Sequence, residues 1–249
     1  MPLDADELAA FSTHGMIIKR GFVSPALVDR AEALVTDWYR TDMDQNLLVD
    51  YTQRTFAPEL GSHPDILALF TQSGVAGLVR DLVGDFTAIT TTQIQIRVPE
   101  TELLHVQPDK AMHVDGVACP HLDPAELRTF SLLVGVVLTD ISDPAGGALH
   151  YVPGGHVKMA EWFRTGWSLG ISDQVPPHID AERGVAFLGK PGDVLVMHHL
   201  VPHSVGHNRT TTPRIMAYFR ISHVDHPNRR LKALCDPWLD FPALAARVR

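Results

Sequence analysis

The stretch Met112-His113-Val114-Asp115-Gly116 places an imidazole and a carboxylate two residues apart. If this stretch is extended, His113 and Asp115 leave the same face of the strand, because side chains alternate along a strand with a period of two. Together they can hold one metal ion between them. In a chain with 14 histidines the pair alone is a weak signal, so a metal site needs a third ligand from elsewhere.

Three further histidines, His198, His199 and His203, follow a turn at Pro191-Gly192-Asp193 and an apolar run. His198 and His199 are adjacent and face opposite sides of a strand, so at most one of them points inward. Arg214 begins the next expected strand and would bring a guanidinium to an antiparallel neighbour. From the residues alone, each of the three histidines remains a candidate for the third ligand.

Two histidines and one carboxylate leave three coordination positions open on a metal ion. This ligand set is typical of non-haem Fe(II) oxygenases. Two open positions suit a bidentate α-keto acid and the third suits O₂. The planar guanidinium of Arg214 is suited to hold the far carboxylate of such a co-substrate through paired, charge-assisted hydrogen bonds.

The chain resembles the Fe(II)- and 2-oxoglutarate-dependent dioxygenases of the phytanoyl-CoA dioxygenase type. The resemblance covers most of the chain, and one departure is a Pro-Gly-Gly-His turn where the family usually has Pro-Gly-Ser-His. A glycine keeps that turn. The motifs that carry the resemblance come in the family's order: Gly21-Phe22, Gln93-Ile94-Gln95-Ile96-Arg97, His113-Val114-Asp115, the stretch from Gly147 to His156, and His203 with Arg214.

The resemblance implies that His113, Asp115 and His203 bind Fe(II), and that Arg214, eleven residues after His203, binds the C5 carboxylate of 2-oxoglutarate. It implies an oxidation in which O₂ and 2-oxoglutarate are consumed and succinate and CO₂ are released. Because Asp115 stands where the related halogenases have Gly or Ala, their chloride site is absent. Hydroxylation, desaturation or ring closure of a small organic molecule is expected instead, with hydroxylation favoured.

Six further residues are candidate contacts in this site. By the resemblance, Gln95 and, ranked below it, Gln93 touch the co-substrate or an iron-bound water, and Ser204 hydrogen-bonds its carboxylate. Substrate contacts are expected from Arg97, His150 and Trp162, and each of these also has a structural explanation, as an ion-paired, surface or core side chain. Together the candidates are Gln95, Gln93, Ser204, Arg97, His150 and Trp162.

The elements that must position these residues divide the chain into a helical and a β-rich part. Residues 1–85 read as mainly helical, with Ser24-Pro25 as a helix start, helices near 64–71 and 75–83, and a loop over 41–61. Short Thr-, Ile- and Val-rich runs separated by Gly and Pro then predict strands within 86–222, with an insert at 157–184 and a C-terminal tail at 223–249.

This order predicts a mainly β fold with helices packed outside it. The resemblance makes the fold a double-stranded β-helix, that is, a cupin-like jelly roll, with the N-terminal helices outside the barrel. We expect one dioxygenase domain over residues 1–249. Two rivals remain: a cupin-type metal enzyme that uses no 2-oxoglutarate and does not depend on Arg214, and a catalytically silent jelly-roll binding protein whose histidines are structural.

The composition and charge of the chain limit the classes of partner that it can bind. The chain has 21 Lys and Arg against 29 Asp and Glu, a formal charge of −8, which argues against a nucleic acid or an anionic membrane. Cys119 and Cys235 lie far apart, so neither a disulfide framework nor a thiolate zinc site is indicated. Acidic residues follow the first methionine in place of a basic signal region. A cytoplasmic monomer or homodimer with a small-molecule substrate is expected.

Overall fold

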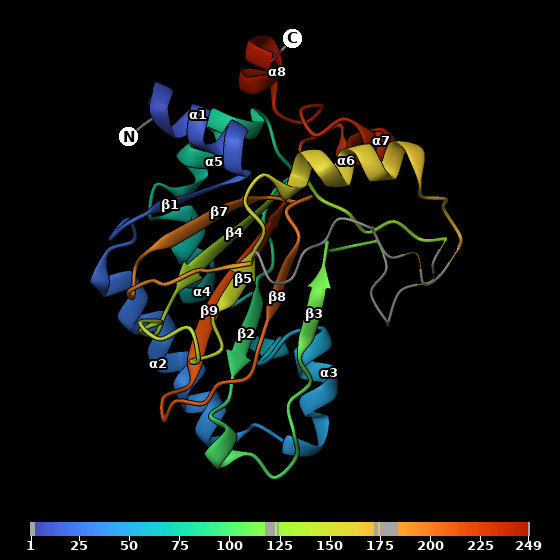
Figure 1. The fold of residues 1–249 in the computed structure, drawn as a ribbon. Coiled ribbons are helices and arrows are strands. Elements are labelled where there is room, and N and C mark those ends of the chain that lie inside the picture. Colours follow the sequence, from blue (N-terminus) through green and yellow to red (C-terminus); the bar gives the residue numbers. More distant parts are fainter. Residues whose placement is uncertain (1–2, 118–122, 124, 172–173, 175–183, 249) are drawn as a thin grey trace.

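Two antiparallel sheets face each other in the computed structural model, which describes residues 3–117, 123, 125–171, 174 and 184–248 (Figure 1). Neighbouring strands are distant in sequence, so the chain crosses repeatedly between the sheets, as in the expected jelly roll. The larger sheet has the order β1 (Met16–Lys19), β7 (Val194–His198), β4 (Leu132–Val137), β9 (Arg214–Ile221) and β2 (Gln93–Arg97), and the smaller has β3 (Lys110–His113), β8 (His203–Val205), β5 (Leu149–Tyr151) and β6 (Val185–Ala186).

Helices cover the outer face of the larger sheet. Ile215, Ala217 and Phe219 of β9 belong to the core shared with these helices, whereas Met216 and Tyr218 face the smaller sheet. The period of two thus separates an outer core from the space between the sheets. The helices of the described residues are α1 (Ala5–His14), α2 (Pro25–Thr41), η1 (Gln45–Leu47), α3 (Leu48–Gln53), η2 (Pro58–Leu60), α4 (Pro64–Thr71), α5 (Val75–Val83), η3 (Glu100–Glu102), α6 (Gly155–Thr165), α7 (His226–Cys235) and α8 (Pro242–Val248). Of these, α6 and α7 pack against each other in a separate apolar cluster.

The helices at 64–71 and 75–83 match their predictions, and strands β2 to β9 lie within the predicted range 86–222. The prediction of a loop over 41–61 is wrong. Asp44 accepts a hydrogen bond from the backbone of Asn46 and starts η1, and Tyr51 of α3 packs edge-on against Trp38, with ring centroids 5.4 Å apart. The insert begins with α6, and the parts of it at 172–173 and 175–183 lie outside the described residues.

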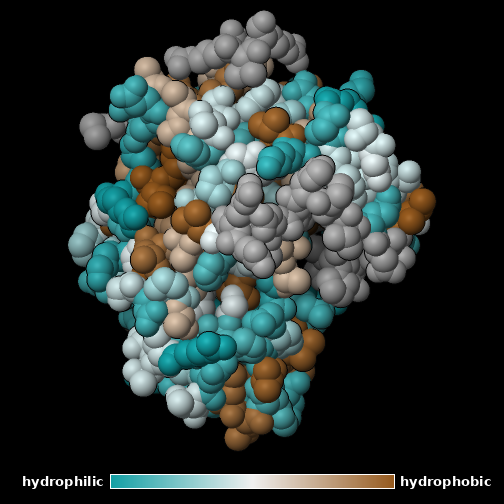
Figure 2. Space-filling model, viewed as in Figure 1, coloured by the Kyte–Doolittle hydropathy of each residue, from teal (hydrophilic) through white to brown (hydrophobic). Residues whose placement is uncertain are grey.

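Apolar side chains gather at the lower edge of the face in Figure 2, near α3, where Val49 is 51% exposed. Among the described residues no single helix has the length and apolar composition to cross a membrane, whereas α4 and α5, bent by 53°, satisfy both only as a pair.

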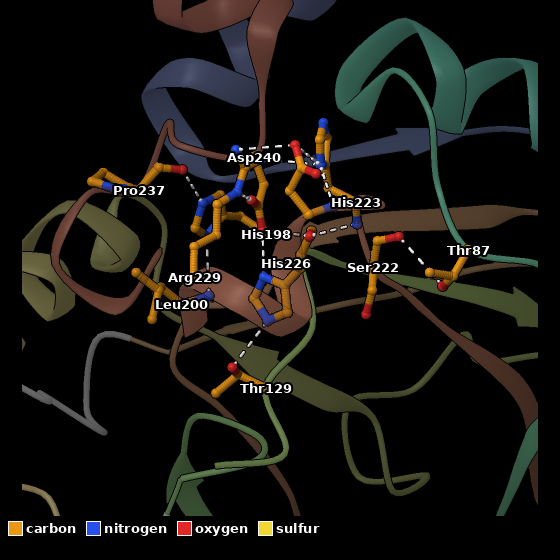
Figure 3. Close-up of polar contacts among 12 residues, drawn as sticks. Thr87, Thr129, His198, Leu200, Ser222, His223, His226, Arg229, Pro237 and Asp240 are labelled. Carbon is orange, nitrogen blue, oxygen red and sulfur yellow. Dashed lines mark hydrogen bonds and ion pairs between the residues drawn. The ribbon is translucent and has the colours of Figure 1, made fainter. Parts of the chain in front are cut away.

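A buried polar network joins α7 and the segment after it to the start of β4 (Figure 3). Asp240 accepts hydrogen bonds from Ser131 Oγ at 2.6 Å and Arg229 Nε at 2.8 Å, and contacts His226 Nδ1 at 2.5 Å. The other ring nitrogen of His226 lies 3.0 Å from the Thr129 hydroxyl. Burial raises the pKa of Asp240, but His226, Ser131 and Arg229 outweigh burial and hold the pKa below its ordinary value.

Three buried histidines near this network are neutral. Burial lowers the pKa of His156 to about 4. Burial and the neighbouring imidazoles hold the pKa values of His198 and His199 well below the ordinary range. Below about pH 6.5 these histidines therefore bind protons in the unfolded chain but remain neutral in the folded protein. As a result, the free energy of unfolding falls as the pH drops toward 4.

We expect His156 alone to cost the protein about 2 kcal/mol of stability between pH 7 and pH 5, at about 1.4 kcal/mol per pKa unit. Urea unfolding of the wild type and of His156→Gln at both pH values measures this cost. The variant begins less stable, because His156 is fully buried, but should lose about 2 kcal/mol less on acidification. Equal losses in the two proteins would contradict a neutral His156.

Candidate metal centre

Three potential metal ligands converge where β3 meets β8. His113 at the end of β3 pairs with His203 at the start of β8, and their ring centroids are 4.6 Å apart. Asp115 Oδ1 lies 3.4 Å from His113 Nε2. One donor atom from each of the three residues lies within 4.8 Å of the others, close enough for all three to bind one ion.

Asp115 reaches this position from a turn rather than from the strand, since β3 ends at His113. Gly116 has φ +78°, and a Cβ there would lie 2.5 Å from the carbonyl oxygen of Arg128. The Arg128 amide also donates to the Gly116 carbonyl at 2.9 Å. Glycine is therefore required at the turn that brings Asp115 beside the two histidines.

Both histidines present Nε2 to the centre. Nδ1 of His113 lies 2.6 Å from the Ala111 carbonyl, and Nδ1 of His203 lies 3.0 Å from the Val201 carbonyl, so Nδ1 carries the proton in each ring. Burial, with His113 nearby, lowers the pKa of His203 to about 4. Burial opposes ionisation of Asp115, but Arg220 and the two histidines hold its pKa well below the ordinary value. Neutral imidazoles and an ionised carboxylate are the forms that bind metal.

Arg214 lies buried at the start of β9, only 2% exposed. Its Nη2 donates to the Tyr218 hydroxyl at 3.2 Å. Its Nε is also buried and has no hydrogen-bond partner in the described part of the chain. A buried guanidinium N–H without a partner fits a ligand carboxylate, and with the three donors it satisfies what Fe(II) and 2-oxoglutarate require.

A pocket opens beside the three ligands and Arg214. Gln93 and Gln95 of β2 line it, and both side-chain amides donate to the Arg54 carbonyl, Gln95 at 3.1 Å. The structure thus brings together the predicted ligands, Arg214 and both glutamines.

The other four candidates are not among the residues that line this pocket. Ser204 and His150 are paired across β8 and β5, and Ser204 alternates with His203 and Val205, which line the pocket. Arg97 is buried and donates to the carbonyls of Pro108 and Val205, both at 2.7 Å, so it links β2 to the end of β8 and to the segment that leads into β3. The Trp162 ring contacts the Phe163 ring at a tilt of 58°, with centroids 4.9 Å apart.

The rival third ligands also lie elsewhere. His198 Nδ1 accepts a hydrogen bond from the Leu200 amide at 3.0 Å, and His198 Nε2 lies 2.6 Å from the Pro237 carbonyl. The His199 ring stacks on His198, with centroids 4.7 Å apart. Of the three candidates, His203 is the one that faces His113.

Three polar pocket residues were not anticipated from the sequence: Lys110 of β3, and Tyr218 and Arg220 of β9. A signal for the two on β9 was available. Both lie an even number of residues after Arg214, so the strand period places all three on one face.

The family model described as phytanoyl-CoA dioxygenase (PhyH) matches residues 11–216. No curated protein sequence matches the chain. Among solved structures, the non-heme alpha ketoglutarate dependent carbocyclase SnoK from nogalamycin biosynthesis is similar with TM-score 0.62 and 16% identity, covering 92% of this chain and 90% of SnoK.

Two further structures resemble the chain. EctD from S. alaskensis, solved with 2-oxoglutarate and 5-hydroxyectoine, has TM-score 0.62 and 20% identity, covering 90% of this chain and 77% of EctD. HygX from Streptomyces hygroscopicus, solved with nickel and 2-oxoglutarate, has TM-score 0.61 and 18% identity, covering 90% and 88%. These likenesses confirm the jelly-roll fold. Because the family model spans most of its length, the chain belongs to the phytanoyl-CoA dioxygenase (PhyH) family.

Proposed function

We propose that this chain is an Fe(II)- and 2-oxoglutarate-dependent oxygenase that hydroxylates a small organic molecule. The observation that carries the proposal is the buried Arg214 beside two histidines and a carboxylate, with one guanidinium N–H left without a partner. Membership in the family supports the same reaction class. EctD and HygX, solved with 2-oxoglutarate, add that related folds take this co-substrate.

The chain's own residues hold and orient the reactants. His113 and His203 would bind Fe(II) through Nε2, because their Nδ1 atoms face backbone carbonyls, and Asp115 would add the negative ligand. When bound, Fe(II) and 2-oxoglutarate supply the means to activate O₂, with succinate and CO₂ as co-products. Arg214 would hold the far carboxylate of 2-oxoglutarate, and the apolar side chains of Leu133 and Leu149, which also line the pocket, would help to exclude water from it.

Both rival functions explain fewer observations. A metal enzyme without 2-oxoglutarate has no use for a buried cation beside the ligands, and a silent binding protein has no use for three convergent donors. We also propose a single domain over residues 1–249, supported by a core that joins the N-terminal helices, the larger sheet and Leu244 of α8. The acidic balance of the chain supports a small-molecule partner, and we propose a cytoplasmic monomer or homodimer.

Anaerobic visible titration tests the proposal. The metal-free protein should give a weak charge-transfer band only when Fe(II) and 2-oxoglutarate are both present, because the band reports chelation of the keto acid. Succinate release on exposure to air follows as the second readout. One bound iron per chain without a band would favour the cupin-type rival, and no bound iron would favour the silent jelly roll.

A further inference from the structure

A second arginine of β9, Arg220, lines the same pocket. Its Nη2 donates to Asp115 Oδ2 at 3.3 Å, and its guanidinium carbon lies 5.4 Å from the centre of the Phe130 ring. Asp115 therefore turns one oxygen toward His113 and the other toward Arg220. The aromatic ring and this ion pair hold the guanidinium plane at the edge of the metal centre.

Arg220 differs from Arg214 in its exposure to solvent. Arg214 is 2% exposed, whereas the Arg220 side chain is 43% exposed. A guanidinium has five N–H donors, and Arg220 makes one hydrogen bond within the described residues. The co-substrate accounts for the enclosed cation, and Arg220, which is exposed and has further N–H donors, is the cation left for a second molecule.

The charge of the pocket points the same way. Although the chain carries a formal charge of −8, the described lining of this pocket includes Lys110, Arg214 and Arg220 against a single carboxylate, Asp115. The metal ligands account for Asp115, and the co-substrate accounts for Arg214. Arg220 then remains as the accessible cation of the pocket, and a neutral substrate would make no use of its charge.

We propose that the molecule oxidised at this site carries a carboxylate that Arg220 binds, and that the oxidised carbon lies within a few bonds of that carboxylate. The proposal rests on the proposed function. The planar fork of the guanidinium matches a carboxylate, and direct contact with Asp115 places the bound anion next to the metal ligands. Arg220 is then a substrate-binding residue that also orients Asp115.

Matched probes that differ in charge but not in shape test this proposal. Benzoate and hexanoate, each against its primary amide, are titrated anaerobically into the protein loaded with Fe(II) and 2-oxoglutarate, and binding is followed by the change in the visible band. We expect the acids to bind at least about tenfold more tightly than the amides, as a charge-assisted pair requires. Phenyl phosphate serves as the alternative anion.

Variants of Arg220 distinguish its binding of the substrate carboxylate from its orientation of Asp115. In Arg220→Gln the acid-to-amide preference should fall to about one, because a looser Asp115 weakens both probes alike whereas loss of the cation weakens only the acids. Arg220→Lys should keep part of the preference but bind the acids several-fold more weakly, since the fork is lost. Lys190→Gln, which removes a surface cation paired with Asp140, should leave the preference unchanged.

Each outcome decides between the proposals. No band with Fe(II) and 2-oxoglutarate in the wild type overturns the proposed function and this inference with it. A normal band with equal binding of acids and amides, tighter binding of phenyl phosphate than of benzoate, or a preference retained in Arg220→Gln overturns only the carboxylate substrate. If Arg220→Gln takes up no iron, wild-type acid affinity in Arg220→Lys overturns the role of the fork.

Discussion

Replacing His203 by alanine should abolish succinate release and lower the affinity for Fe(II) by at least about a hundredfold. His203 supplies one of three donors, and even loss of a group that only orients a ligand costs about ten- to a hundredfold. The His203 ring is buried with Nδ1 held by the Val201 carbonyl, and among the described residues no fourth potential ligand joins the cluster of His113, Asp115 and His203. Iron content per chain and succinate release measure the two effects.

His199→Ala is the matched control, because His199 is also a buried histidine but stacks on His198, away from the pocket. It should lose stability, since a buried side chain is removed, yet bind Fe(II) as tightly as the wild type. If His203→Ala remained active with a full complement of iron while His199→Ala lost its metal, the third ligand would lie in the pair His198 and His199.

Most of the fold can be predicted from the spacing of apolar residues and from the Gly and Pro residues between elements. The errors of this prediction have a common cause. Local apolar spacing, with Pro or Gly at the helix start, predicts helices such as α4 and α5. The segment 41–61 does not, because α3 is stabilised by distant rings, such as Trp38 against Tyr51. Tertiary packing of this kind leaves no local pattern in the sequence.

The candidate site shows what the alternation of side chains between the two faces of a strand can predict and what it cannot. His113 and His203 follow from spacing and resemblance, but Asp115 depends on the turn at Gly116, whose need appears only when Arg128 is seen against it. The alternation alone predicts that Ser204, which is adjacent to His203, faces the other side of β8. The same rule extends the face of Arg214 to Arg220, so the residue that we assign to the substrate was within reach of the sequence.

Arg214→Gln should raise the 2-oxoglutarate concentration needed for half-maximal succinate release by roughly ten- to a hundredfold. Hydrogen bonds to charged groups contribute about 1.5–3 kcal/mol, and a factor of ten corresponds to about 1.4 kcal/mol. Fe(II) binding should be retained, because Arg214 hydrogen-bonds Tyr218 and none of the three ligands. Arg214→Lys should lie in between, since a lysine keeps the charge but not the fork.

Arg209→Gln is the matched control for this prediction, because Arg209 is exposed and lies in the connection that leads into β9. Its 2-oxoglutarate requirement should equal that of the wild type. If Arg214→Gln also kept the wild-type requirement, the buried Nε would not be the partner of the co-substrate. The carboxylate would then have to pair with Lys110 or Arg220, the other cations lining the pocket, and Arg220 could no longer be reserved for the substrate. Measuring the 2-oxoglutarate affinity of Arg214→Gln therefore decides which of the two arginines on this strand face serves the co-substrate.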